Sequence, residues 1–393
     1  MSQRTQDIAA LFERSGEGPL SGIVIADFGR VLAGPYCTML LADMGATVLK
    51  VESLDGDETR AWMPPVFDDT STYYLSINRN KHSIALDFRD DDDLAVAKAL
   101  AARCDVLVEN FKPGSLARFG LDYASVRKLN PEVLYASITG FGTAGGADLP
   151  GYDLLVQGAA GLMSLTGDED TVPYRAGVAV FDVFTGLHTG LAILAALHHR
   201  TQTGKGQLLE VNLMSVALSS MVNQTAAYAI AGVTPRRLGN EHPSIYPYSP
   251  FPTRDGDLIL AIGNDNQFTA FADIIGATHL PTDPRFATNH ERSLNRDELR
   301  PIIEARLVLR PTEEWFGLFR AAGLPCAPIN DVAQGIRFAE AIGLEPVVTV
   351  GRGATAQSGV RNPVTFSRTP VTYDLVPPKL NDSGEAIRAW LQD

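Results

Sequence analysis

One aspartate, Asp182, lies in a setting that could support covalent chemistry. It stands between apolar residues in AGVAVFDVFTGLHTG, where a strand-like run turns into a helical pattern. A carboxylate among apolar neighbours is costly unless it is hydrogen-bonded or used in chemistry, and a carboxylate can form a covalent acyl intermediate. Aspartate is also a favoured helix N-cap residue. From this stretch alone, the sequence favours capping of the following helix over catalysis.

A turn after the first strand-like run could hold a phosphate. It lies in DFGRVLAGPYCTMLLADMGATVLKVE, where Gly34 and Pro35 lead into a helix. The free N–H groups at the start of such a helix can receive a phosphate. The segment lacks the GxGxxG spacing of a dinucleotide-binding loop. Within it, we expect Asp27 and Arg30 to form a local ion pair.

Two later segments carry cations. NRNKHSIALDFR concentrates three basic side chains in an acidic protein: Arg79, Lys81 and Arg89. Isolated surface cations are usually only solvated, which is the expectation for this segment taken alone. In ENFKPGSLARFG, Asn110 and Phe111 end a strand at the sheet edge where ligands normally bind, and Lys112 and Arg118 follow closely. This combination suits a phosphorylated cofactor with an aromatic headgroup.

The elements that position these residues follow an α/β order through residue 140. Four short apolar runs predict strands: Gly22–Phe28, Thr47–Glu52, Asp105–Glu109 and Val133–Thr139. Their nearly continuous apolar character is typical of a parallel sheet covered on both faces. Between them, Cys37–Met44 and Asp91–Arg103 predict crossover helices, and the acidic residues 90–93 complement the dipole of the second helix.

The rest of the chain predicts further helices and a second domain. Phe184–Arg200 has helical spacing, and the run after TQTGKGQ is a second helix or a strand and a helix. Prolines punctuate Leu238–Asp257, which we interpret as a linker or active-site loop. DLILAIG predicts a strand of a small domain, and three amphipathic stretches predict its helices: Gln267–Ile275, Arg296–Leu307 and Thr312–Ala322.

Composition narrows the classes of protein and partner. The chain has 393 residues, 45% of them hydrophobic and 20% charged, which suits two globular domains. Its net charge of -13 disfavours nucleic acid as a partner. Three widely spaced cysteines predict neither a disulfide framework nor a zinc site. A charged N-terminus and interrupted apolar segments lead us to expect a cytoplasmic protein with no membrane partner.

These motifs, in this order, resemble the family III coenzyme A transferases, the group that contains formyl-CoA transferase, carnitine CoA-transferase and 2-methylacyl-CoA racemase. The resemblance rests on the first-strand segment, NRNKHSIALDF, DVLVENFKPGSLARFGLDY and TGKGQLLEV, and covers nearly the whole chain. It implies that Asp182 is the nucleophile, and that no metal is needed. It also implies that a set of residues contacts coenzyme A: Leu32, Ala33, Leu86, Asp87, Phe88, Arg89, Asn110, Phe111, Lys112, Arg118 and Tyr152.

The resemblance also implies a fold, a reaction and an assembly. The fold is α/β, with a Rossmann-like large domain around a parallel sheet and a smaller α/β domain, in an interlocked homodimer. Its boundaries would be 1–225 for the first part of the large domain, 226–256 for a linker and active-site loop, 257–346 for the small domain and 347–393 for a return segment. The reaction moves coenzyme A from an acyl-CoA to a carboxylic acid through an aspartyl anhydride and an aspartyl-CoA thioester.

Departures from the family pattern bear on the substrate. Leu32 replaces a glutamine of formyl-CoA transferases, Pro150 replaces a lysine, and HPSIYPYSPFPTRDG takes the place of their glycine-rich loop. These differences weaken an oxalate or formate assignment. The range of the family and the cationic or hydroxyl-bearing residues lead us to expect a short dicarboxylate such as succinate, glutarate or a methylated relative. Candidate residues for its carboxylates are cationic or hydroxyl-bearing: Arg175, Arg236, Arg237, Tyr246 and Tyr248.

Three alternatives stand beside transfer. Racemases of the family carry Gly-His-Asp where this chain has Gly151, Tyr152 and Asp153, and a tyrosine of ordinary pKa near 10 is a poor proton shuttle. A Rossmann dehydrogenase would need the missing glycine-rich fingerprint. A coenzyme A-binding regulator without catalysis would not need Asp182. The sequence favours transfer over all three.

Overall fold

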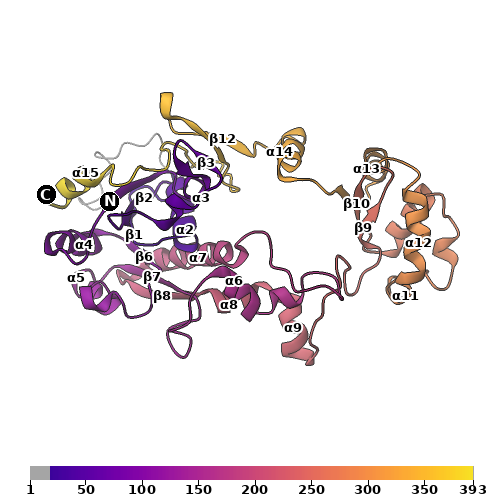
Figure 1. Cartoon of the computed structure of the whole chain (residues 1–393), viewed down its shortest axis with the longest axis horizontal. Helices are drawn as coiled ribbons and strands as arrows, with labels where there is room; N and C mark the ends of the chain where they lie inside the picture. Colours follow the sequence, from indigo (N-terminus) through magenta and orange to yellow (C-terminus); the bar gives the residue numbers. More distant parts are fainter. Residues whose placement is uncertain (1–17, 393) are drawn as a thin grey trace. The chain divides into compact units, whose positions relative to one another are not determined.

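The computed structural model describes residues 18–392, which divide into two compact units (Figure 1). The first unit contains the described chain through Leu162, the segment Arg175–Val233 and the chain from Glu345 onward. The second contains Met163–Tyr174 and Thr234–Leu344. The assignment of the short segment Met163–Tyr174 to the second unit has no counterpart in the division expected from the sequence.

The first unit is built on a six-stranded parallel sheet in the order β5-β2-β1-β6-β7-β8. Its strands are β1 Val24–Asp27, β2 Thr47–Glu52, β5 Lys81–Ala85, β6 Val106–Glu109, β7 Leu134–Thr139 and β8 Gln207–Asn212. The four predicted strands are confirmed, with small differences at their ends. β5 was not predicted as a strand, and β8 with the helix after it settles the open choice for the run following TQTGKGQ.

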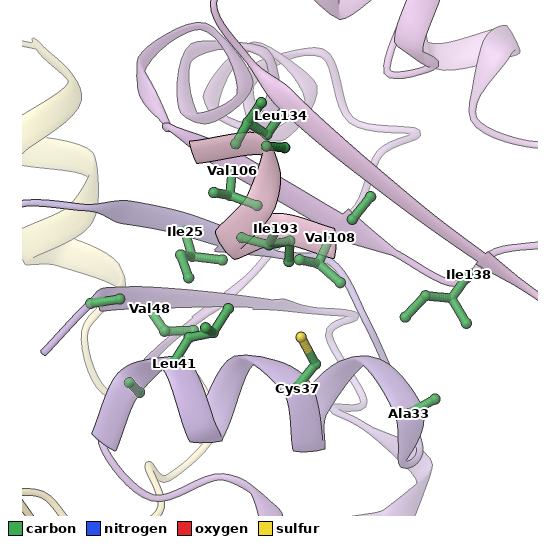
Figure 2. Packing of buried hydrophobic residues seen from close by; sticks show 14 of the residues in the cluster. Ile25, Ala33, Cys37, Leu41, Val48, Val106, Val108, Leu134, Ile138 and Ile193 are labelled. Carbon is green, nitrogen blue, oxygen red and sulfur yellow. The ribbon is translucent and has the colours of Figure 1, made fainter. Parts of the chain in front are cut away.

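Helices cover both faces of this sheet. They include α2 Ala33–Asp43, α4 Asp91–Arg103, α5 Tyr123–Leu129, α6 Asp153–Ala159, α7 Val180–Thr203, α8 Leu213–Ser220 and α15 Gly384–Gln392. Another helix, α9 Val222–Ala231, follows α8 and has no buried residue. Alternate strand residues enter two hydrophobic cores, one with α4, α5 and α15 and the other with α2, α7 and α8. Figure 2 shows the second core, where strand residues pack against α2 and α7: Ile25, Val48, Val106, Leu134, Cys37, Leu41 and Ile193.

The two crossover helices differ in how well they were predicted. α4 has the expected bounds, and the Asp90 carboxylate caps it by accepting hydrogen bonds from the N–H groups of Asp92 and Asp93, at 3.0 and 3.1 Å. α2 begins at Ala33, one turn before the expected start. α7 is long and apolar enough to cross a membrane by length and composition alone; it packs on the sheet through residues such as Phe181 and Ile193.

The expected ion pair between Asp27 and Arg30 is wrong. Asp27 is buried and instead accepts hydrogen bonds from Lys81 Nζ at 3.0 Å and Thr38 Oγ1 at 2.6 Å. Arg30 lies 3.6 Å from Glu58 at the surface. The pair between Asp27 and Lys81 was not predicted, because Lys81 lies on β5 and the polar sequence of this strand does not indicate burial.

Arg79 and Lys81 are likewise not solvated surface cations. Arg79 is buried and forms two hydrogen bonds to the Asp43 carboxylate, at 2.6 and 2.9 Å. The C-terminal segment covers β5 and its approach, because Asn80 N donates to Leu375 O and Ser383 N donates to Ser83 O. Of the three cations predicted there, only Arg89 is exposed, in a surface pair with Asp87.

Small elements complete the first unit. Short strands β3 Val66–Phe67 and β4 Thr70–Ser71 precede α3 Thr72–Ile77. β12 Val347–Val350 and β13 Gln357–Val360 form an antiparallel pair in the returning chain. The side chain of Arg79 donates to the Val360 carbonyl at 2.9 Å, so this return is joined to the main body of the unit.

The second unit has a three-stranded antiparallel sheet in the order β11-β10-β9. Its strands are β9 Tyr248–Pro252, β10 Asp257–Ala261 and β11 Cys326–Pro328, and its helices are α10 Asp265–Ile274, α11 Asn289–Leu294, α12 Arg296–Leu307, α13 Thr312–Ala321 and α14 Val332–Ala341. The strand from DLILAIG and the three amphipathic helices are confirmed. β9 lies inside the segment predicted as a linker or loop, where Phe251 enters the core of the unit.

Candidate active site

A pocket of about 410 Å³ opens in the first unit beyond the carboxyl ends of β1, β6 and β7. This is the edge at which open parallel sheets usually bind ligands. Part of the predicted site set lines it: Leu32, Ala33, Asn110, Phe111, Lys112, Tyr152 and Asp182. The fold thus gathers residues that lie far apart in the sequence around a single cavity.

The remaining predicted coenzyme A residues lie outside the pocket lining. Leu86 is buried in the core, while Asp87 and Arg89 form their surface pair with a 2.9 Å contact. Phe88 packs on Phe119 with ring centroids 5.6 Å apart, and the Arg118 guanidinium lies over Phe119 at 4.5 Å. These residues form a second group, joined through the two phenylalanines. Their contact with coenzyme A stays a prediction.

Asp182 lies in the first turn of α7, but it does not cap this helix. The N-cap residue is Ala179, which provides no side-chain hydrogen bond. Instead the Asp153 carboxylate, from the start of α6, accepts hydrogen bonds from the N–H groups of Phe181 at 2.8 Å and Asp182 at 3.2 Å. The capping role weighed for Asp182 belongs to Asp153. Among residues 18–392, the Asp182 carboxylate has neither a hydrogen-bond nor an ion-pair partner.

The surroundings make Asp182 an unusually basic carboxylate. Burial, together with repulsion by the Asp153 carboxylate, raises the pKa of Asp182 to about 7. Burial and repulsion by the same two carboxylates raise the pKa of Tyr73 to about 12. The Tyr73 hydroxyl therefore stays protonated and able to donate a hydrogen bond near Asp182. A carboxylate this basic binds a proton, or attacks an electrophile, more readily than an ordinary aspartate.

Sequence reasoning missed Asp153 and Tyr73 as part of the site. Asp153 was considered only within the triplet that distinguishes racemases, although an acidic residue at the start of a helical pattern is visible in the sequence. Nothing in the sequence around Tyr73 indicates its place, because α3 reaches the site only in the folded chain. Trp62 packs edge-on against its ring, with centroids 5.2 Å apart.

Asp153→Asn is expected to lower the pKa of Asp182 without removing the helix cap. The amide oxygen of asparagine can still accept the N–H groups of Phe181 and Asp182, whereas the repelling charge is lost. The burial contribution remains, so the pKa falls only part of the way toward the ordinary value of 3.8. The measurement is the pH dependence of kcat/KM between pH 5 and 8.5, whose acid limb should move from about 7 to lower pH. A limb that stays in place would show that Asp153 does not act on Asp182 through its charge.

Two backbone features shape the pocket wall. Val31 lines the pocket with a φ of 65°, a left-handed conformation that costs a β-branched residue about 1–3 kcal/mol. Gly140 and Gly151 meet back to back, since a Cβ on Gly140 would lie 2.3 Å from the Gly151 Cα. Glycine at these two positions lets the loop between them return to the pocket.

Comparison with known proteins decides the family. The model of CoA-transferase family III matches residues 20–383. The chain belongs to CoA-transferase family III. It is 42% identical to a succinate–glutarate CoA-transferase of Agrobacterium fabrum, over 95% of this chain and 96% of that protein. It is 40% identical to the succinyl-CoA:glutarate CoA-transferase of Mus musculus, over 92% of this chain and 84% of that protein.

A solved structure agrees with this family membership. The crystal structure of a CAIB/BAIF family protein from Brucella suis matches with a TM-score of 0.86 and 40% sequence identity, over 95% of this chain and all of that one. The protein is thus an enzyme that transfers coenzyme A between an acyl-CoA and a carboxylate. The racemase alternative is not favoured, because the relatives named here are CoA-transferases.

Proposed function

We propose that this CoA-transferase exchanges coenzyme A between short dicarboxylic acids, with Asp182 as the nucleophile. Asp182 attacks the thioester carbonyl, the C–S bond breaks, and an aspartyl anhydride and a CoA thiolate form. The thiolate then attacks the aspartyl carbonyl, which releases the donor acid and leaves an aspartyl-CoA thioester. The acceptor carboxylate attacks that thioester to give a second anhydride, and the thiolate completes the exchange by attacking the acceptor acyl group.

The observation that carries this proposal is the unpaired carboxylate of Asp182 on the pocket wall. A nucleophile held in an ion pair would lose reactivity, but Asp182 has no cation beside it in the described part of the chain. Its pKa of about 7 combines a substantial ionised fraction near neutral pH with a basic oxygen. Both properties suit a carboxylate that forms and breaks acyl bonds.

The substrate proposal comes from the relatives, whose names give succinate and glutarate as substrates. Among the candidate carboxylate-binding residues, Arg236 pairs with Glu169 at 2.7 Å, and Arg237 donates to the carbonyls of Asp168 and Glu169. Tyr246 is buried in the second unit. Arg175 has no ion pair within residues 18–392, and is therefore the freest cation of the three arginines.

The experiment that tests the function uses succinyl-CoA as donor with a panel of acceptor acids. Glutarate is expected to be the best of glutarate, malonate, oxalate and acetate, with product acyl-CoA measured by chromatography. Activity confined to acetate would contradict the dicarboxylate proposal, and activity confined to oxalate would contradict succinate and glutarate as the substrates. The absence of transfer to every acid in the panel, with succinyl-CoA and acetyl-CoA as donors, would contradict the proposed reaction.

Lys112→Ala is expected to weaken acyl-CoA binding more than it slows the chemical steps. Lys112 lines the pocket, and its ammonium pairs with Asp148 at 2.8 Å where both side chains are exposed. A phosphate of coenzyme A can replace this partner, and loss of such a charge-assisted contact costs about 1.5–3 kcal/mol, or roughly 10–150-fold in KM. Steady-state kinetics measure the effect. Asp148→Ala is the matched control, since it frees the ammonium and should not raise KM; an unchanged KM in Lys112→Ala would move the phosphate site elsewhere.

We also propose that the protein acts as a homodimer, interlocked as the family resemblance implies. Apolar side chains on α7–α9 of the first unit are exposed in the single chain: Leu187, Leu191, Val222, Tyr228 and Ile230. Such patches commonly mark association surfaces. Light scattering at micromolar concentration should give the dimer mass, and a monomer would contradict the interlocked arrangement. The cytoplasmic location stays a prediction.

A further inference from the structure

The turn Gly29–Val31 is held by the side chain of Asp27 at the end of β1 and by side chains from more distant segments. Gly29 N donates to Asp27 Oδ1 at 3.0 Å, and Gly29 O accepts a hydrogen bond from Lys50 Nζ at 3.0 Å. Val31 N lies 3.4 Å from Asp57 Oδ1. Lys50 and Asp57 are themselves a buried ion pair with a 2.9 Å contact. This side of the turn is therefore fixed by a pair of charges that cannot easily rearrange.

Asn110 holds the other side of the same turn. Its Oδ1 accepts the Arg30 N–H at 2.9 Å, and its Nδ2 donates to the Arg30 carbonyl at 2.7 Å. Both polar atoms of the Asn110 side chain are thus hydrogen-bonded to the backbone of Arg30. The group that the family resemblance assigns to coenzyme A is already bonded to the chain itself.

The held conformation is a strained one. Val31, with its φ of 65°, follows Arg30, whose backbone is hydrogen-bonded to Asn110. It precedes Leu32 and Ala33, which line the pocket. Without external contacts a valine would leave this region, because its Cβ crowds the backbone there. Strain of this kind persists only where the surroundings over-determine the backbone. Relaxation of Val31 would rotate the chain that enters α2 and move one wall of the pocket that Asp182 shares.

We propose that Asn110 is a positioning residue, which keeps Val31 in its left-handed conformation and so keeps the Leu32–Ala33 wall in the geometry that transfer at Asp182 requires. The effect on transfer rests on the proposed function; the effect on the turn does not. The proposal separates Asn110 from its neighbour Lys112, whose ammonium pairs only with the exposed Asp148 and can exchange that partner for a phosphate of the substrate.

A double-mutant cycle tests this role, with succinyl-CoA and glutarate as the assay pair. Asn110→Ala is expected to lower kcat about tenfold or more, since a small misplacement of a reacting group is costly, while KM for succinyl-CoA changes less than about threefold. Val31→Gly supplies the second reference rate of the cycle, because Val31 itself lines the pocket and glycine adopts φ 65° without strain. In the double variant, kcat should lie within about threefold of the value for Val31→Gly alone, so that the loss caused by Asn110→Ala largely disappears.

Val222→Gly provides the matched control for strain relief. Val222 is also a valine with positive φ, 37°, but it is 68% exposed and outside the pocket lining. In the Val222→Gly background, Asn110→Ala should still lower kcat about tenfold relative to Val222→Gly alone, a comparison that allows for the place of Val222 in the proposed dimer surface. Equal recovery by both glycine variants, or no recovery by Val31→Gly, would overturn the proposal. A raised KM with unchanged kcat, as expected for Lys112→Ala, would instead make Asn110 a direct contact of coenzyme A.

Hydrogen exchange separates this inference from the proposed function. The amide of residue 31 should exchange faster in Asn110→Ala even though its own acceptor, Asp57, is intact, and it should slow again in the double variant. An unchanged exchange rate at residue 31 in Asn110→Ala would overturn the inference whatever the enzyme does. A wild-type protein without transfer activity would contradict the proposed function, while the exchange rates would still decide the role of Asn110.

Discussion

Asp182→Asn should abolish coenzyme A transfer while leaving the fold intact. A neutral amide cannot attack a thioester to form the anhydride, so we expect a loss of at least about a thousandfold, or roughly 4 kcal/mol in the barrier. The fold should survive because the side chain of Asp182 has no bonded partner in residues 18–392 and the cap of α7 comes from Asp153. A rate within about tenfold of wild type would exclude the carboxylate as the nucleophile.

Asp182→Asn should also change how the stability of the protein depends on pH. The folded pKa of Asp182, about 7, lies above the ordinary 3.8. Between these values the folded protein keeps a proton that the unfolded chain loses, so stability falls as pH rises toward 7, and the full penalty is present above that pH. Asparagine does not titrate. Asp182→Asn should therefore be more stable than wild type at pH 8, by up to about 4 kcal/mol at 1.36 kcal/mol per pKa unit, and similar to it near pH 4.

Denaturant unfolding at the two pH values measures this difference. Equal stabilities of Asp182→Asn and wild type at pH 8 would show that folding does not raise the pKa of Asp182. The intermediate offers an independent check: hydroxylamine with wild type and succinyl-CoA should modify Asp182 alone, as detected by peptide mass. Asp153→Asn serves as the control, because it removes the neighbouring carboxylate but leaves the nucleophile.

Lys81→Met should strongly lower the free energy of unfolding of the first unit. The Lys81 ammonium uses all three of its donors, on Asp27 Oδ2 at 3.0 Å, Pro35 O at 2.8 Å and Asn78 Oδ1 at 2.9 Å. Burial lowers the pKa of Lys81 to about 8, so desolvation outweighs the attraction of Asp27. Removing one partner of such a pair leaves the other charge buried and uncompensated, which costs about 3–5 kcal/mol.

The double variant Asp27→Asn, Lys81→Met separates pairing from packing. With no buried charge left, stability should return most of the way to wild type, since asparagine can keep the contacts with Thr38 and the Gly29 N–H. Chemical denaturation of wild type, Asp27→Asn, Lys81→Met and the double variant gives the coupling energy directly. If Lys81→Met lowers the free energy of unfolding by less than about 1 kcal/mol, the Asp27 carboxylate does not need the Lys81 ammonium as its partner.

The sequence predicted the interior of the sheet but not its charged edge. β1, β2, β6 and β7 are continuous apolar runs, and their pattern alone indicates strands buried on both faces. The sequence of β5 is polar and basic, which does not indicate a buried strand. β5 becomes buried because the chain from about Leu375 to Ser383 covers it. That covering segment lies almost 300 residues further along the sequence, where no local pattern can reveal it.

The site was predicted unevenly for a related reason. Asp182 and the segment after β6 follow from local features that the family resemblance made specific. The cap supplied by Asp153, the nearby Tyr73 and the grip of Asn110 on Arg30 depend on contacts between separate elements. Such contacts exist only in the folded chain, which is why the local sequence alone favoured Asp182 as the cap of the helix.

The C-terminal cover over β5 also has a consequence for synthesis on the ribosome. Arg79, Lys81 and their acidic partners are made early, but the segment that shields β5 from water is made about 300 residues later, with the Ser83 carbonyl accepting the Ser383 N–H. The second unit, whose chain is complete by Leu344, can fold while this segment is still inside the exit tunnel. The first unit therefore stays incomplete until this segment has left the tunnel, and chains that stall before it would expose a charged sheet edge to chaperones and proteases.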